Sequence, residues 1–422
     1  MTRDDPAEPR PRWGLTRYVA AATPARTADG GGVVAIVLIV TTSGGPAWLA
    51  GLLGAAITAP HLLGPFVARR LDTAPDGRSV IALACLIHGA MLAAAVLLYR
   101  HAPVAVPALL LVLSGLVGPF LTGGISSRLP AIAGPSQHSQ RRAQGWDVAT
   151  YGLGGTIGPS IVAIISAWST PTVAALLLAG GTVIAAGIVR LLPFAAPATD
   201  AGEVPKPLQT LGIMLTTGPL RRTLYLTVIV ALSVAVLPIT AVSSTASLGA
   251  AAVAAGALVA AYGLGNLAGS AGVMIHPLKG EADKLMTRLA LVIAAALTAV
   301  LLAPNVWLAV ACYALAGIAN AYFFAATLAA RSEYSPIEAR GQVFVWVGAL
   351  KITAGSAGTA AAGAVVGTSL HLPLILATSI TVLAVIGSAT ERKALLGVGS
   401  RVGKHLTKPS GTRRREKLPT RP

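Results

Sequence analysis

The sequence predicts an all-α membrane protein of twelve transmembrane helices, arranged as two parallel repeats of six. The chain of 422 residues is 54% hydrophobic and only 11% charged, with a mean hydropathy of +0.73. Soluble chains usually have about a quarter of their residues charged. The apolar residues gather in stretches of about twenty, the length of helix that crosses a bilayer core of about 30 Å. A water-soluble fold is therefore excluded.

The order of the apolar stretches defines the predicted domains. A polar tail (residues 1–16) precedes a first six-helix bundle (17–194), a Pro-containing linker (195–218) and a second bundle (219–391). The basic segment 392–422 has no apolar periodicity, so we expect it to be disordered. We predict the spans at 17–41, 47–69, 79–99, 104–127, 145–167, 171–193, 219–242, 249–274, 286–303, 306–330, 341–366 and 371–389.

The cations predict the topology. The chain has 32 Lys+Arg against 15 Asp+Glu, and the cations fall in every second gap between the spans. The gaps on the other side hold only Arg100. Cytoplasmic loops carry such an excess, which places both termini in the cytoplasm and the chain in the plasma (inner) membrane as a multi-pass protein. The net charge of +17 then reflects topology, and no nucleic-acid partner is expected.

The two halves share a sequence pattern. Arg142-Ala143-Gln144-Gly145-Trp146 opens the fifth span, and Arg340-Gly341-Gln342-Val343-Phe344 opens the eleventh. Arg128 and Arg331 follow the fourth and tenth spans in the same way. Matching motifs at the same point of each six-span unit indicate a duplication, and both copies lie on the same side.

Parallel six-helix halves resemble the major facilitator superfamily. Its loop between spans two and three is similar to Gly64–Asp72 followed by Asp76-Gly77-Arg78 here. That loop controls the inward/outward switch in the family, so the resemblance implies this role for Asp72 and Arg78. The family's antiporters carry a glycine pattern in span five that ends in Gly-Pro, and the matching residues here are Gly145, Gly154, Gly158 and Pro159. The resemblance implies a secondary transporter that works by alternating access.

Glycines spaced four apart recur in spans five, eight and eleven. The pairs are Gly154 and Gly158, Gly265 and Gly269, and Gly363 and Gly367. Lipid gives helices no hydrophobic drive to associate, so close packing needs small residues. We expect these pairs near the interface between the halves, where smooth contacts allow one half to tilt. Ordinary helix packing without motion is the alternative.

Charges inside the membrane are costly, so each one is a functional candidate. Arg26 and Asp29 lie in the first span, three residues apart, and Gly30–Gly32 give that span a discontinuous character. We expect Asp29 to bind a coupling proton or a cationic group of the substrate. Arg26 would then tune the pKa of Asp29 or meet an anionic group. A mutual salt bridge that only holds the span together is the alternative.

Span eleven contains Lys351 near mid-membrane. This lysine either pairs with Asp29 across a cavity, binds an anionic substrate, or serves as a structural partner for a helix end. Asp147, at the start of span five, is interpreted as part of a gate or loop salt bridge. Arg142 and Arg340 are further gate candidates.

Uncharged and titratable side chains complete the candidate set. His61 in span two titrates near neutral pH when unperturbed, and Asn266 and Asn320 can hydrogen-bond between helices. A lone histidine or asparagine inside a membrane more often has a structural role, which is the alternative for each. Tyr151 and Tyr262 are candidates to line a cavity.

The preferred function is proton-coupled export of a small molecule, with the lipid bilayer, the substrate and protons as partners and a monomer as the expected state. Proton-coupled uptake is the close alternative. A non-transporting sensor is a minor one, as is a prenyltransferase-type enzyme using Asp72 and Asp76. No nucleotide-binding or hydrolase motif is present, and no Cys/His spacing suggests a metal. We therefore expect no enzyme activity and no cofactor.

Overall fold

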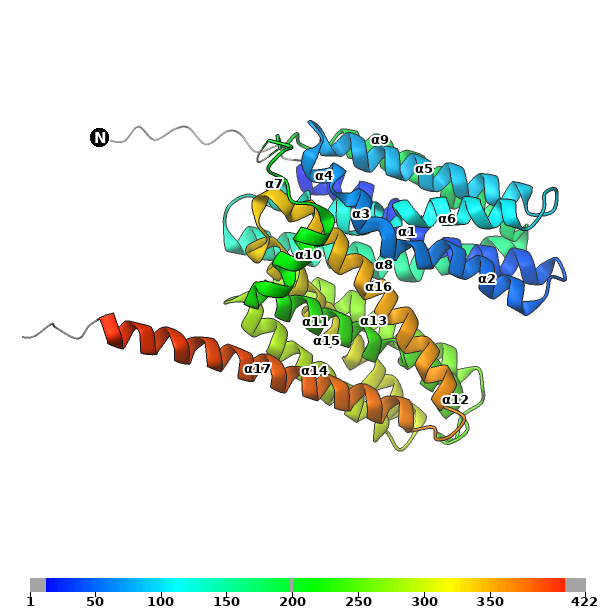
Figure 1. The fold of residues 1–422 in the computed structure, drawn as a ribbon. Coiled ribbons are helices and arrows are strands. Elements are labelled where there is room, and N and C mark those ends of the chain that lie inside the picture. The colour runs from blue at the N-terminus through cyan, green and yellow to red at the C-terminus, as the bar shows by residue number, and fades with distance from the viewer. Residues whose placement is uncertain (1–12, 198–199, 407–422) are drawn as a thin grey trace, which may run out of the picture.

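The computed structural model describes residues 13–197 and 200–406. Within these residues, twelve helices are long and apolar enough to cross a membrane, as the sequence predicts, and no strand is present. Figure 1 shows the helices in two groups, the first in blue to green and the second in green to red. We call these groups the N-half and the C-half. The expected all-α fold of two six-helix units is confirmed.

The N-half contains the first six spans, some of them built from several short helices. Its elements are α1 (Gly14–Thr42), α2 (Ala47–Thr58), η1 (Ala59–Leu63), α3 (Gly64–Ala68), α4 (Arg70–Thr73), α5 (Gly77–Leu98), α6 (Ala105–Pro119), η2 (Phe120–Gly124), α7 (Leu129–Ala133), α8 (Gln137–Trp168) and α9 (Pro171–Arg190).

The linker and the C-half follow. Their elements are α10 (Pro207–Thr216), α11 (Gly218–Val234), α12 (Leu237–Ser244), α13 (Ala254–Ile275), α14 (Ala282–Leu301), α15 (Val306–Tyr334), η3 (Ile337–Ala339), α16 (Arg340–Val365) and α17 (Leu372–Leu406). The beginning of α1, the linker helix α10 and the end of α17 lie at the same end of the bundle, on the left of Figure 1. We call this the linker end.

Helix α1 is continuous through its three glycines, so the expected interruption at Gly30–Gly32 is wrong. The glycines serve close packing instead. A Cβ on Gly30 would lie 2.8 Å from the carbonyl oxygen of Gly154, and one on Gly158 would lie 2.5 Å from the carbonyl oxygen of Thr27. Helices α1 and α8 therefore cross with their backbones almost in contact, which larger residues at these positions would prevent. Pro159 lies inside α8 without ending it.

The three glycine pairs pack less uniformly than expected. A Cβ on Gly265 would collide with the carbonyl oxygen of Ala314, and one on Gly269 would meet Ile318, both in α15. These contacts lie within the C-half, as those of Gly154 and Gly158 lie within the N-half, rather than between the halves. Gly363 and Gly367 face open space, so the packing role predicted for them is wrong. A spacing of four residues places two glycines on one helix face but does not say what that face meets.

The halves touch most closely at the linker end. A Cβ on Gly123 of η2 would lie 2.5 Å from the carbonyl oxygen of Phe344 in α16. Val345 of α16 is fully buried among N-half residues, in a cluster with Phe120 and Leu121. Toward the opposite end, the helices of the two halves diverge in Figure 1.

Two boundaries differ from the predicted ones. The linker, expected to be a loop, contains α10, because Pro207 starts a helix whose Met214 packs with Trp346 and Val343 of α16. The last helix continues to Leu406, beyond the predicted start of a disordered tail at 392. The remainder of that tail, 407–422, lies outside the described residues, as do residues 1–12 of the N-terminal tail.

Two glycines with the same spacing in the sequence should respond differently to substitution by alanine, as measured by the stability of the protein. We expect Gly265→Ala to destabilise the protein by about 1–3 kcal/mol through overpacking against α15. Gly363→Ala is the matched control in another span and should be neutral or slightly stabilising, because its methyl group enters open space. Thermal unfolding of both variants in detergent measures the difference, and equal midpoints would contradict the packing described here.

Candidate functional site

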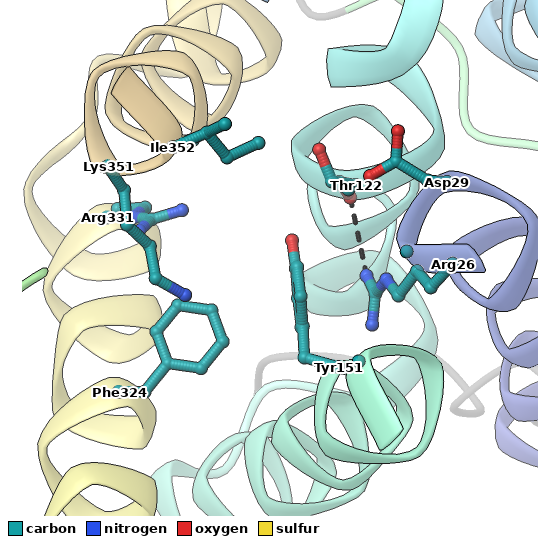
Figure 2. Close-up of a pocket in the computed structure, with 11 residues that line it drawn as sticks. Arg26, Asp29, Thr122, Tyr151, Phe324, Arg331, Lys351 and Ile352 are labelled. Atoms are coloured by element: carbon teal, nitrogen blue, oxygen red, sulfur yellow. Dashed lines mark hydrogen bonds between the residues drawn. The ribbon is translucent and has the colours of Figure 1, made fainter. Parts of the chain in front are cut away.

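A cavity of about 160 Å³ lies between the halves and is lined by charged residues from both. From the N-half come Arg26 and Asp29 of α1, Thr122 of η2 and Tyr151 of α8, among others. Figure 2 shows them facing Phe324 and Arg331 of α15 and Lys351 and Ile352 of α16 across the open space. Three charged residues expected to have roles inside the membrane therefore meet in one place.

Arg26 is neutralised by Asp147 rather than by Asp29. Its Nη1 donates to Asp147 Oδ1 at 2.6 Å, and the Tyr18 hydroxyl donates to the same oxygen at 2.6 Å. Nη1 also contacts Thr150, and Nη2 donates to Ser126 Oγ at 2.9 Å. A buried charge needs this kind of paired and hydrogen-bonded surrounding. The alternative of an Arg26–Asp29 salt bridge is therefore wrong, and Asp147 joins α8 to α1 within the N-half instead of forming a gate.

Asp29 pairs with His61, another of the predicted residues. The His61 Nε2 and Asp29 Oδ1 atoms are 3.2 Å apart, and the Asp29 side chain is 17% exposed against 4% for His61. The carboxylate therefore borders the cavity while the imidazole, from η1, lies behind it. This arrangement is suited to holding and exchanging a proton, because either member of a carboxylate–imidazole pair can carry it.

Lys351 and Arg331 have no carboxylate partner within 4 Å among the described residues. The Lys351 ammonium lies 3.6 Å from the ring centroid of Phe324 and 5.4 Å from that of Tyr151. The expected contact between Lys351 and Asp29 is not made, although both residues border the same cavity. Arg331 is buried and its Nε and Nη2 atoms have no hydrogen-bond partner.

The two asparagines lie away from this cavity. Asn320 lines a second cavity of about 220 Å³, which shares Phe324, Lys351 and Ile352 with the first. Tyr262 lines the second cavity too. Asn266 is half-buried on α13, where its side-chain oxygen approaches Gly152 of α8.

A second group of polar contacts joins the halves at the linker end. Asp72 Oδ1 accepts from the Gly341 N–H at 2.8 Å, and Oδ2 accepts from the Gln342 N–H at 2.9 Å. A carboxylate at a helix N-terminus satisfies free backbone donors and interacts favourably with the helix dipole. Arg340 borders a cavity beside this contact.

Arg141, not the predicted Arg142, makes a further contact between the halves at this end. Arg141 Nη2 donates to Glu333 Oε1 at 2.8 Å and to the Gly280 carbonyl oxygen at 3.0 Å. Gly280 has a φ of +98°, a conformation that side chains rarely adopt. Arg142, the next residue, is exposed. A one-residue step turns a helical side chain by about 100°, so neighbouring arginines face different surroundings.

Arg78 stays within the N-half. Its Nε donates to Asp76 Oδ1 at 2.9 Å, and its Nη1 donates to the Leu192 carbonyl oxygen at 2.7 Å. The Arg78 guanidinium lowers the pKa of Asp76, which lies between two spans, to about 2. Arg78 thus fixes the start of α5 against the end of α9 and does not reach the interface between the halves.

Arg331 and Phe324 are the site residues that sequence reasoning missed. The predicted tenth span ends at residue 330, whereas α15 continues to Tyr334. Arg331 was therefore counted as a loop cation although it is inside the bundle. The spacing of Phe324 and Arg331, seven residues or two helical turns, places both on one face and was the available signal. Within the described residues, no cluster of three or more His, Cys, Asp or Glu side chains could hold a metal ion.

The buried Arg26–Asp147 pair should control stability. We expect Asp147→Asn to cost about 3–5 kcal/mol, because it leaves the Arg26 charge uncompensated. Glu281→Gln, which removes the exposed Lys284–Glu281 pair, should change stability by less than about 1 kcal/mol. Thermal unfolding of both variants tests this. A small effect of Asp147→Asn would mean that Arg26 is neutralised elsewhere.

Comparisons with known proteins agree with this architecture. No protein-family model and no curated protein sequence matches the chain. Solved structures do match. The human organic anion transporter MFSD10 is 16% identical, with 90% of this chain and 99% of that chain covered and a TM-score of 0.69. A bacterial homologue of the iron transporter ferroportin, in an outward-facing state, is 14% identical, with 90% and 99% covered and a TM-score of 0.68.

An Escherichia coli fucose:proton symporter of the major facilitator superfamily is also similar. It is 13% identical, with 89% of this chain and 98% of that chain covered and a TM-score of 0.66. These likenesses extend over nearly the whole of each chain, so they concern the complete arrangement of helices. The chain has the fold of the major facilitator superfamily transporters.

Proposed function

We propose that the protein is a secondary active transporter that moves a small molecule by alternating access, with the charged cavity as its central site. The observation that carries this proposal is the position of that cavity. It is lined by both halves, and the hydrogen bonds and ion pairs between the halves, within the described residues, all lie at the linker end. Such a site can be opened to one side or the other by tilting one half against the other.

The linker end is proposed to face the cytoplasm, since the loops at that end carry the cations. Arg69, Arg128, Arg142, Lys279 and Arg340 all belong to it. The contacts that close this end then make the described conformation the outward-facing one. Similarity to a structure recorded in an outward-facing state supports this assignment.

Asp29 and His61 are proposed to carry the coupling proton. Their carboxylate–imidazole contact borders the cavity, so a proton can reach it from the same side as the substrate. The titratable and charged groups around Asp29 are His61 behind it, His88 of α5, Arg26 one turn away on α1, and Lys351 across the cavity. Arg26 is already neutralised by Asp147, so Asp29 is the carboxylate of the cavity lining whose charge is not used by Arg26. Protonation of Asp29 removes that negative charge from the site.

Proton-driven export is the proposed direction, on the strength of the antiporter-like spacing of Gly145, Gly154, Gly158 and Pro159. Proton-coupled uptake is the alternative, and similarity to a fucose:proton symporter favours it. Both directions use the same cavity and the same coupling residues.

Neutralising Asp29 should remove proton coupling while leaving the folded protein able to exchange substrate. We expect Asp29→Asn to abolish pH-driven transport in proteoliposomes, because an amide cannot take up the proton. Substrate counterflow without a pH gradient should persist. Glu281→Gln, an exposed carboxylate far from the cavity, is the control and should transport normally. Full pH-driven transport by Asp29→Asn would remove Asp29 from the coupling mechanism.

Weakening the contacts at the linker end should shift the protein toward the opposite conformation. Asp72→Ala removes both hydrogen bonds to the start of α16. We expect a population with wider separation between spin labels at His138 and Lys279, which are exposed on the two halves at this end. The native Cys85 and Cys312 are buried and should not be labelled.

The readout is the distance distribution from pulsed electron spin resonance. Asp76→Ala, which alters a nearby carboxylate that contacts only the N-half, is the matched control and should leave the distribution unchanged. An Asp72→Ala distribution identical to that of the unmodified protein would show that Asp72 does not hold this end closed.

A further inference from the structure

We propose that the central cavity binds a small amphipathic organic anion, with its anionic group at Lys351 and Arg331 and its apolar part in the adjoining cavity of the C-half. This inference rests on the proposed transport function and adds the class of substrate. The arrangement of charges around the cavity carries it.

The charges that border the cavity do not balance. Arg26 is compensated by Asp147, which leaves Asp29 against Lys351 and Arg331. With Lys351 protonated and Asp29 ionised, the lining therefore has one excess positive charge. An uncompensated charge in a membrane interior is costly, and such groups mark the pathways of substrates and ions. A bound anion would supply the missing negative charge.

Arg331 has unused donors in the right place. Its side chain is buried, it borders the cavity, and its Nε and Nη2 atoms have no hydrogen-bond partner. A guanidinium remains protonated at physiological pH and presents paired donors that match a carboxylate or a phosphate. The ring centroids of Phe324 and Phe344 each lie 5.8 Å from the guanidinium carbon.

Lys351 is positioned to be the second anchor. Its ammonium lies 3.6 Å from the ring centroid of Phe324 and 5.4 Å from that of Tyr151, and the two rings belong to different halves. Contacts with aromatic faces stabilise a cation partially but leave its charge in place. Asp29 does not serve as its counterion, because the two do not approach within 4 Å and Asp29 is engaged by His61. Lys351 therefore remains available to an incoming anion.

The adjoining cavity indicates the chemical character of the remaining part of the ligand. It shares Phe324, Lys351 and Ile352 with the first cavity and has a volume of about 220 Å³. Its walls are otherwise mostly apolar, with Tyr262 and Asn320 as hydrogen-bonding groups. A ligand with an anionic group at Lys351 would lay an apolar body along this second space. Free inorganic anions would leave it unfilled.

The test is ligand-induced stabilisation of the purified full-length protein at low ionic strength, where charge contacts are least screened. The probes are benzoate, octanoate and phenyl phosphate, with benzamide and octanamide as uncharged counterparts of the two carboxylates. We expect at least one anion to raise the unfolding midpoint at concentrations up to about 10 mM, and the amides to have no comparable effect.

Variants of Lys351 test whether this residue holds the anionic group. Lys351→Met should weaken binding of the active anion by about tenfold or more, whereas Lys351→Arg should largely retain it. Arg100→Gln removes an exposed cation at the other end of the bundle and should bind normally. Equal binding of acid and amide, undiminished binding by Lys351→Met, or no stabilisation by any of the three anions would each overturn the proposal.

The anion-site proposal and the transporter proposal can be contradicted separately. The binding assay needs no membrane gradient, so stabilisation by an anion that never crosses proteoliposomes would sustain the anion site and contradict the transporter. Proton-coupled movement of a neutral substrate, without stabilisation by anions, would sustain the transporter and contradict the anion site. Stabilisation by phenyl phosphate and by inorganic phosphate to the same extent would overturn the role of the apolar cavity.

Discussion

The cost of holding a charge away from water governs this structure. Arg26 is tolerated inside the bundle because Asp147, Ser126 and the Thr122 carbonyl surround it with acceptors, and that network also joins α8 and η2 to α1. Asp29 is tolerated beside His61. Lys351 and Arg331 face the cavity with aromatic rings as their close neighbours. At the cavity, Arg26 is thus compensated within its own half, whereas Lys351 and Arg331 of the other half have no carboxylate within 4 Å among the described residues.

Glycines allow the helices of the N-half to pack closely. Because α1 and α8 approach until backbone meets backbone at Gly30, Gly154 and Gly158, the Arg26 side chain can span the short distance to Asp147. The same device joins α13 to α15 at Gly265 and Gly269. The contacts at these glycine pairs lie within each half, whereas the halves meet at the linker end through the close approach of Gly123 to Phe344 and polar contacts such as that of Asp72. Packing of this kind favours two rigid bodies that meet at a separable interface.

The sequence predicts the spans well, because length and hydropathy are properties of a local stretch. It fails where an outcome depends on another helix. Arg26 and Asp29 share a helix, yet their partners are 121 and 32 residues away in the chain. Gly363 resembles Gly265 in spacing but faces no neighbour. Arg331 was missed for a different reason, since an error of a few residues in a boundary moved a buried cation into a loop.

In the proposed alternating-access cycle, the linker also affects how the closed end opens and closes again. Gln342 donates its backbone N–H to Asp72 of the N-half, while its side chain donates to the Pro205 carbonyl oxygen of the linker at 3.0 Å. Arg69 binds the same segment through the Val204 carbonyl oxygen. If the halves part in the proposed cycle, the chain keeps them tethered, so reclosing is an intramolecular step with a high effective concentration. Contacts at this end can therefore be individually weak and still give a well-populated closed state.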